Sequence, residues 1–308
     1  MSLHTCHSIG ISFPTNLTDS LYNVVTGIFI ICVPTTVLIV LCNLLVIVTI
    51  FTNKCLLQKL YYKGLAYLSF LDLCVGLFVM PIFLHIAFDT VFHIRPCLED
   101  VCFRQQLISS LSYPLVGLTC NGIMLLSLER YYSICHPLRC RDIFTTRNTW
   151  CLLITLWIPT ISSSVAQYFS QKPANTIVCI EIVVYAIVLP TLYFRIFREV
   201  KLSRMRVLSM GGAIHGHGRP QNQAMAKKFS VIIIVMTLCF LPFGLISAIE
   251  AKMHGGTQVY YALLYISCTL ALMNSLFNPL LYLWQDVRLR RLALDWMERM
   301  VCRKQELL

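Results

Sequence analysis

Apolar positions in this chain gather in long stretches separated by short polar segments. Seven such stretches cover residues 24–51, 65–88, 106–128, 150–169, 177–194, 229–250 and 258–284. Each is close to or above the roughly 20 residues that a helix needs to cross a hydrocarbon core. Backbone groups in lipid must be satisfied within their own segment, and the alternating pattern of a membrane β-barrel is absent. The pattern therefore predicts an all-α membrane protein, a seven-transmembrane helix bundle.

The composition supports a membrane protein and orients it. Of the residues, 57% are apolar and 13% are charged, and the formal net charge is +11. Soluble domains carry about 25% charged residues. With the N-terminus outside, all Lys and Arg except Arg95, Arg104, Lys172 and Lys252 fall in cytoplasmic segments. Because basic residues concentrate on the cytoplasmic side, this predicts an extracellular N-terminus and a cytoplasmic C-terminus. The charge suits membrane lipids, and no basic stripe favours nucleic acid.

Short connections predict one bundle domain, with residues 1–23 as an extracellular N-terminus and 24–284 as the transmembrane domain. The first 23 residues show no cleavable signal peptide, and Asn16 of Asn16-Leu17-Thr18 is a glycosylation acceptor. Residues 285–308 mix apolar side chains with Arg, which predicts a short cytoplasmic amphipathic helix on the membrane surface, followed by a tail. Cys302 is either a palmitoylation site or a solvated thiol.

Polar side chains inside the apolar stretches are costly and therefore mark candidate functional positions. They are Asn43, Asp72, Asn274 and Asn278. One interpretation is a hydrogen-bond network between helices. The other adds a small cation such as Na⁺, held by Asp72 with oxygens of Thr119, Asn274 or Ser275, because hard cations favour oxygen ligands. The two are compatible, and no other cofactor or metal is predicted.

Prolines interrupt the last three stretches. Pro190, Pro242 and Pro279 each remove a backbone N–H inside a helix, which creates a local kink. Asn278 lies next to Pro279, and Tyr282 follows one turn later. A helix with a kink that can reset suits a protein with two conformations.

Four segments together are similar to the signature positions of rhodopsin-like (class A) G-protein-coupled receptors. They are LSFLDL with Asp72, LERYYSICHPLR with Arg130, CFLPF with Pro242, and NSLFNPLLY with Asn278. The resemblance implies a receptor that transmits a signal from an extracellular small-molecule ligand to a heterotrimeric G protein at the cytoplasmic face of the plasma membrane. It implies that Glu129 restrains Arg130 at rest, and that the activation switch comprises Glu129, Arg130, Tyr131, Phe240, Pro242, Asn278, Pro279 and Tyr282.

Two positions depart from the family pattern. Glu129 replaces the commoner Asp, and Phe240 stands where many relatives have Trp. The family's outer disulfide would join Cys102 to Cys179, with Cys97 as a competitor for the pairing.

The ligand is less defined than the switch. The third stretch lacks the acid of amine receptors and the seventh lacks the Lys of opsins. A mostly apolar pocket is expected from Ser112, Tyr113, Val116, Phe243, Ser247, Leu264 and Cys268, although the same side chains could simply pack between helices. Several phrases are similar to odorant-receptor-like proteins, particularly fish-type ones. The chain is therefore expected to be a chemosensory receptor, or alternatively a non-olfactory class A receptor for a small apolar, lipid or peptide messenger.

Two other protein classes are disfavoured. A transporter built from inverted halves would show an internal repeat, and none is found. An intramembrane hydrolase would need paired acids, a Ser–His pair or a metal cluster within the apolar stretches, and the sequence offers none. The chain is not expected to be an enzyme.

Overall fold

A computed structural model gives the fold of the chain. It describes residues 3–6, 11–14, 18–94, 97–169, 184–185, 187–202, 205, 219–250 and 257–305. Residues outside these ranges, among them Asn16 and Cys179, lie outside the description.

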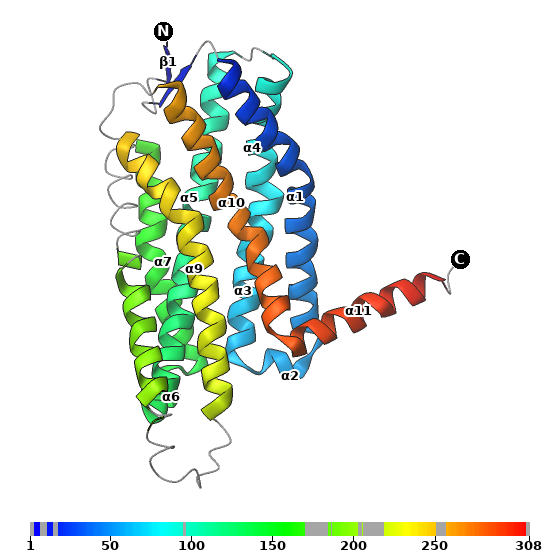
Figure 1. Ribbon diagram of the computed structural model, residues 1–308, viewed down its shortest axis with the longest axis vertical. Helices are drawn as coiled ribbons and strands as arrows, with labels where there is room; N and C mark the ends of the chain where they lie inside the picture. Colours follow the sequence, from blue (N-terminus) through cyan, green and yellow to red (C-terminus); the bar gives the residue numbers. More distant parts are fainter. Residues whose placement is uncertain are drawn as a thin grey trace.

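Long helices run side by side along one axis and form a bundle (Figure 1). They are α1 (Asp19–Thr52), α3 (Leu60–Cys74) continued by α4 (Met80–Val91), α5 (Leu98–Cys135), α7 (Thr146–Phe169), a helix over 187–202, α9 (Arg219–Glu250) and α10 (Gln258–Gln285). Helix α10 packs against both α9 and α1, and α5 packs against α7. The last helix, α11 (Val287–Gln305), leaves the bundle at an angle to the others (Figure 1).

The bundle has two distinct ends. One end carries the strands β1 (Leu3–Cys6) and β2 (Ile11–Pro14) and is called the hairpin end below. The other carries α2 (Lys54–Leu57), α6 (Pro137–Ile143) and the start of α11, and is called the α2 end. Buried side chains form a large cluster toward the α2 end and smaller clusters toward the hairpin end.

The outer faces of the helices are apolar. Along α1, Ile30, Ile31 and Leu41 are each more than half exposed. A soluble protein rarely exposes so much contiguous apolar surface, because each such side chain is more stable away from water. Four helical stretches in the described part of the chain are long and apolar enough to cross a membrane, and residues 231–246 form a shorter apolar helix.

Local signals explain where helices begin. The Thr18 side chain accepts a hydrogen bond from the backbone N–H of Leu21 at the start of α1, and Thr257 does the same for Tyr260 at the start of α10. Such caps satisfy N–H groups that have no partner within the helix. The helices extend past the predicted apolar stretches because the backbone ladder continues into polar sequence.

The predicted helix bundle with a C-terminal helix is present, and two features were not predicted. The first is the antiparallel pairing of β1 with β2, from Leu3 opposite Pro14 to Cys6 opposite Ile11. The second is a π-helical turn, η1 (Val75–Val79), between α3 and α4. The fifth predicted span begins at 177, outside the described residues, and its helix is described from 184.

Candidate functional site

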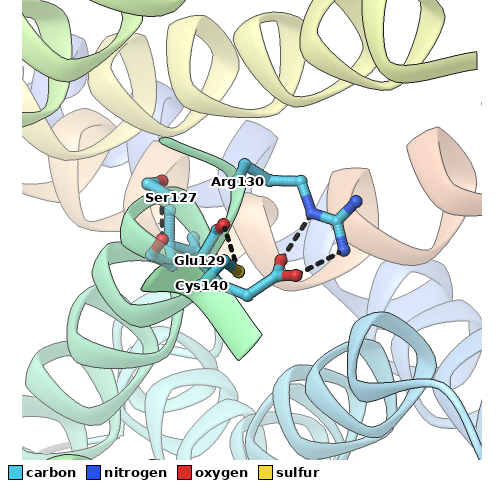
Figure 2. Close-up of polar contacts among 5 residues, drawn as sticks. Ser127, Glu129, Arg130 and Cys140 are labelled. Carbon is cyan, nitrogen blue, oxygen red and sulfur yellow. Dashed lines mark hydrogen bonds and ion pairs between the residues drawn. The ribbon is translucent and has the colours of Figure 1, made fainter. Parts of the chain in front are cut away.

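Glu129 and Arg130 form an ion pair in the last turns of α5, toward the α2 end. Arg130 Nε lies 2.6 Å from Glu129 Oε2, and its Nη2 lies 3.0 Å from Oε1. Figure 2 shows the guanidinium facing both carboxylate oxygens. Both side chains are largely buried, at 12% exposure for Arg130 and 10% for Glu129. A two-pronged pair of this kind is stronger and more directional than a single contact between the same charges.

Neighbouring elements enclose this pair. The Tyr61 ring of α3 lies under the guanidinium, with its centroid 5.5 Å from Arg130 Cζ, within the range of cation–π attraction. The Cys140 thiol of α6 donates to the backbone carbonyl of Glu129 over 3.8 Å (Figure 2). Burial raises the pKa of Cys140, and the Glu129 carboxylate raises it further. Tyr131 is half-buried against the large cluster and has ring contacts to Tyr132 and His136.

The polar side chains predicted inside the bundle meet on α10. Asn43 of α1 donates to the carbonyls of Ile39 and Ser275, both at 2.9 Å. Asn278 donates to Asp72 Oδ2 at 2.9 Å. These contacts connect α1 and α3 to one stretch of α10, and the residues are almost fully buried.

Several buried oxygens in this region accept no hydrogen bond from the described residues. They are the side-chain oxygens of Asn43, Asn274 and Asn278. Thr119 is also buried in α5, where its hydroxyl donates to the carbonyl of Leu115. A buried acid with amide oxygens left over is the donor set that suits a hard cation. The residues therefore fit the predicted Na⁺, while no group of three or more His, Cys, Asp or Glu suited to a metal occurs in the described ranges.

The predicted switch residues of α9 and α10 lie at different levels of the bundle: Phe240 and Pro242 lie in the half of α9 that ends at Glu250, and the α10 residues lie in the half that ends at Gln285. Pro242 and Pro279 each lie inside a continuous helix. Phe240 packs at the margin of the large buried cluster that also contains Tyr282. The Tyr282 hydroxyl is fully buried and has no hydrogen-bond partner among the described residues.

The predicted pocket residues come partly together. The rings of Tyr113 on α5 and Phe243 on α9 lie 6.3 Å apart. Val116 borders the large cluster, Leu264 packs with Ile246 in the cluster nearest the hairpin end, and Cys268 borders the middle one. The hydroxyl of Ser112 donates to the carbonyl of Ile108. The side chain of Ser247 lies outside the described part.

The cysteines at the hairpin end differ in state. Cys102 is disulfide-bonded, whereas Cys97 is a free thiol that donates to Asp100. The pairing of Cys102 with Cys179 stays a prediction, because Cys179 lies outside the described residues.

Reasoning from the sequence missed the polar contacts of two residues, Asn121 and Tyr62. Asn121 of α5 donates to the Leu156 carbonyl and to Thr160 of α7, and accepts from the Tyr185 hydroxyl. Tyr62 of α3 donates to Asp286, between α10 and α11. The amide of Asn121 inside an apolar stretch was a usable signal, whereas nothing local in the sequence connects Tyr62 to Asp286.

The fold and this site define a multi-pass membrane protein with a charged pair at one end of a helix bundle. The family model described as 7 transmembrane receptor (rhodopsin family) matches residues 42–282, and the chain belongs to this family. This range contains Asp72, Arg130, Pro242 and Asn278.

Curated relatives are receptors of several kinds. Adenosine receptor A3 of Ovis aries is 23% identical over 268 residues, 79% of this chain and 80% of that receptor. Melatonin receptor type 1B-B of Danio rerio is 26% identical over 273 residues, 80% of this chain and 75% of that receptor. Olfactory receptor 56A3 of Homo sapiens is 32% identical over 149 residues, 44% of each chain.

Proposed function

We propose that this chain is a G-protein-coupled receptor in which the Glu129–Arg130 ion pair holds the resting state. The observation that carries the proposal is the two-pronged contact at 2.6 and 3.0 Å, largely buried at the α2 end of α5. In this proposal Arg130 leaves Glu129 when α9 moves, and then contacts the G protein. The ligand shifts the population only as far as it binds the open state better than the closed one.

The α2 end is the cytoplasmic face in this proposal. Support comes from the distribution of Lys and Arg along the sequence, which favours the cytoplasm for the segments at this end. The N-terminus with Asn16 is then extracellular, in the plasma membrane. The basic loops anchor lipid headgroups as well as lining the G-protein surface, and the two roles are compatible.

Replacement of Arg130 tests this function. Arg130→Ala is expected to abolish ligand-dependent nucleotide exchange on Gα, while surface expression stays near that of the unchanged chain. The matched control is Arg290→Ala, an exposed Arg on α11 whose side chain donates only to the Trp284 carbonyl, at 3.4 Å, among the hydrogen bonds of the described residues. Exchange that survives in Arg130→Ala would refute the role given to this residue.

The ligand is proposed to be a chemosensory small molecule. The resemblance to odorant receptors, particularly fish-type ones, and the 32% identity to olfactory receptor 56A3 support this class. The similarity to adenosine and melatonin receptors extends over about four fifths of this chain. It supports the alternative, a non-olfactory class A receptor for a small apolar, lipid or peptide messenger. A ligand screen in cells that express the chain distinguishes the chemosensory receptor from the alternative. Odorants and amino acids are applied separately from peptides and lipids, and cAMP and calcium are measured.

A cation at Asp72 belongs to the same proposal. Asp72 would hold Na⁺ with amide oxygens of Asn274 and the hydroxyls of Ser275 and Thr119. The ion would supply positive charge to a buried carboxylate, and the chain's own residues would provide every oxygen apart from water.

A further inference from the structure

Two adjacent tyrosines on α3 connect the ion pair to the start of α11. The ring of Tyr61 lies under Arg130, and the ring of Tyr62 lies 4.9 Å from that of Tyr61, centroid to centroid. Both tyrosines are less than a tenth exposed and belong to the large buried cluster. A change at Arg130 therefore reaches Tyr62 through one intervening ring, and close packing leaves little room for Tyr61 to move alone.

The second contact of Tyr62 is with a helix cap. Its hydroxyl donates to Asp286 Oδ2 over 3.0 Å in a buried environment. The other oxygen, Oδ1, accepts the backbone N–H groups of Arg288 at 3.0 Å and Leu289 at 3.1 Å. One carboxylate thus binds α3 with one oxygen and satisfies the first turn of α11 with the other.

We propose that Tyr61, Tyr62 and Asp286 form a relay that makes the cap of α11 depend on the position of Arg130. All three are positioning residues, and the inference rests on the proposed function in that Arg130 leaves Glu129 on activation. When Arg130 withdraws, Tyr61 loses the cation over its ring and the tyrosine pair reorients. The Tyr62–Asp286 bond then weakens and the first turn of α11 loosens.

The coupling is reciprocal, because two linked equilibria bias each other by the same factor. Anything that fixes the start of α11 against α3 also favours the closed ion pair. A partner that pulls α11 away favours the open one. In this way α11 acts as a regulator of Arg130 without contacting it.

Hydrogen exchange of the purified full-length chain tests the relay. Glu129→Gln removes the negative charge with little change in shape and so weakens the ion pair. When Tyr62 is kept, Glu129→Gln is expected to speed hydrogen exchange of the Arg288 and Leu289 backbone amides by about threefold to tenfold. This is the range that the loss of one hydrogen bond produces. In Tyr62→Phe, exchange is already fast and Glu129→Gln adds nothing.

Tyr67→Phe is the matched control. Tyr67 is on the same helix, and its hydroxyl bonds to Trp157 and to the Leu118 carbonyl. This variant loses an α3 tyrosine hydroxyl outside the relay, so its α11 amides must still respond to Glu129→Gln. Tyr61→Leu, which keeps the Tyr62 hydroxyl, must lose the response and provides a second test if Tyr62→Phe folds poorly.

The relay would be overturned if Glu129→Gln changed hydrogen exchange of the α11 amides equally in chains with and without the Tyr62 hydroxyl. It would also be overturned if Glu129→Gln changed nothing in the chain that keeps Tyr62. A response retained in Tyr61→Leu would do the same. The measurement needs no G protein. Nucleotide exchange that survives in Arg130→Ala, together with an intact α11 response, would therefore refute the proposed function alone. Exchange that is lost in Arg130→Ala, together with an absent α11 response, would refute the relay alone.

Discussion

The ion pair of Glu129 with Arg130 joins neighbours in sequence, which seldom face each other on a helix. The geometry here arises because Arg130 has a long side chain that turns back to the Glu129 carboxylate, and because Tyr61 covers it from α3. Glu129 also reaches farther than the Asp commonly found at this position. The longer side chain lets both carboxylate oxygens meet the guanidinium.

At Asp72, the amide of Asn278 is a partner whose loss leaves a buried acid less satisfied. Asn278→Leu is expected to destabilise the chain by about 1–3 kcal/mol, since the buried Asp72 carboxyl loses a hydrogen-bond donor. Thermal unfolding in detergent, followed by a thiol-reactive dye, measures the change. Asp72→Leu combined with Asn278→Leu removes both partners and is expected to cost less than Asn278→Leu alone. A double variant that is less stable than Asn278→Leu alone would contradict this account of the pair.

Sodium dependence is expected at the same residue. If Asp72 and the unpaired amide oxygens hold Na⁺, the unfolding temperature rises when NaCl replaces choline chloride at equal ionic strength, because a ligand that binds only the folded state stabilises it. Asp72→Asn is expected to remove that rise. The cation is ruled out if the unchanged chain unfolds at the same temperature in both salts.

At the scale of elements, glycines set how closely helices approach. A Cβ added at Gly122 of α5 would lie 2.7 Å from Tyr67 Cε1, and that ring is held by stacking on Trp157 and by the bond between them. Gly122→Ala is therefore expected to cost about 1–3 kcal/mol through overpacking. Gly27→Ala on α1 is the control, because nothing lies within 4 Å of its added Cβ. Equal unfolding temperatures for the two variants would contradict the close packing of α5 on α3.

The elements divide into those that the sequence predicts and those that it does not. Long apolar stretches predict helices because lipid leaves the backbone no other way to satisfy its groups. The π-helical turn at Val75–Val79 has no signal in the hydropathy pattern. It contains Gly76, where an added Cβ would lie 2.8 Å from Ile39 of α1. No alternating pattern of apolar residues in the sequence predicts the pairing of β1 with β2. Residue types in the site were predictable from their cost in lipid, as for Asp72 and Asn278.

Over the whole molecule, contacts between distant residues were beyond prediction from one sequence. Tyr62 and Asp286 are 224 positions apart, and Asn43 and Ser275 are 232 apart. Which tyrosine meets which acid depends on how the helices turn and cross, and hydropathy carries no such information. Comparison with known proteins shows the family, while the choice between odorant and messenger stays a prediction.

The whole molecule thus combines buried polar contacts on α10, a proline inside each of α9 and α10, and a charged pair at the α2 end of α5. In the proposed function, the ion pair restrains the transition between a closed and an open conformation of the chain. A restraint of this kind has a direct consequence without any ligand, because weakening it raises the population of the open state.

The central measurement is basal nucleotide exchange on purified Gα by the reconstituted chain, compared with Glu129→Gln and with Glu129→Gln combined with Arg130→Ala. The ion pair predicts that Glu129→Gln raises basal exchange by about fivefold or more, the effect of roughly 1 kcal/mol on a two-state equilibrium. The combined variant should fall to the level of Gα alone, because the residue that contacts the G protein is gone. Basal exchange unchanged or lowered by Glu129→Gln would contradict the account.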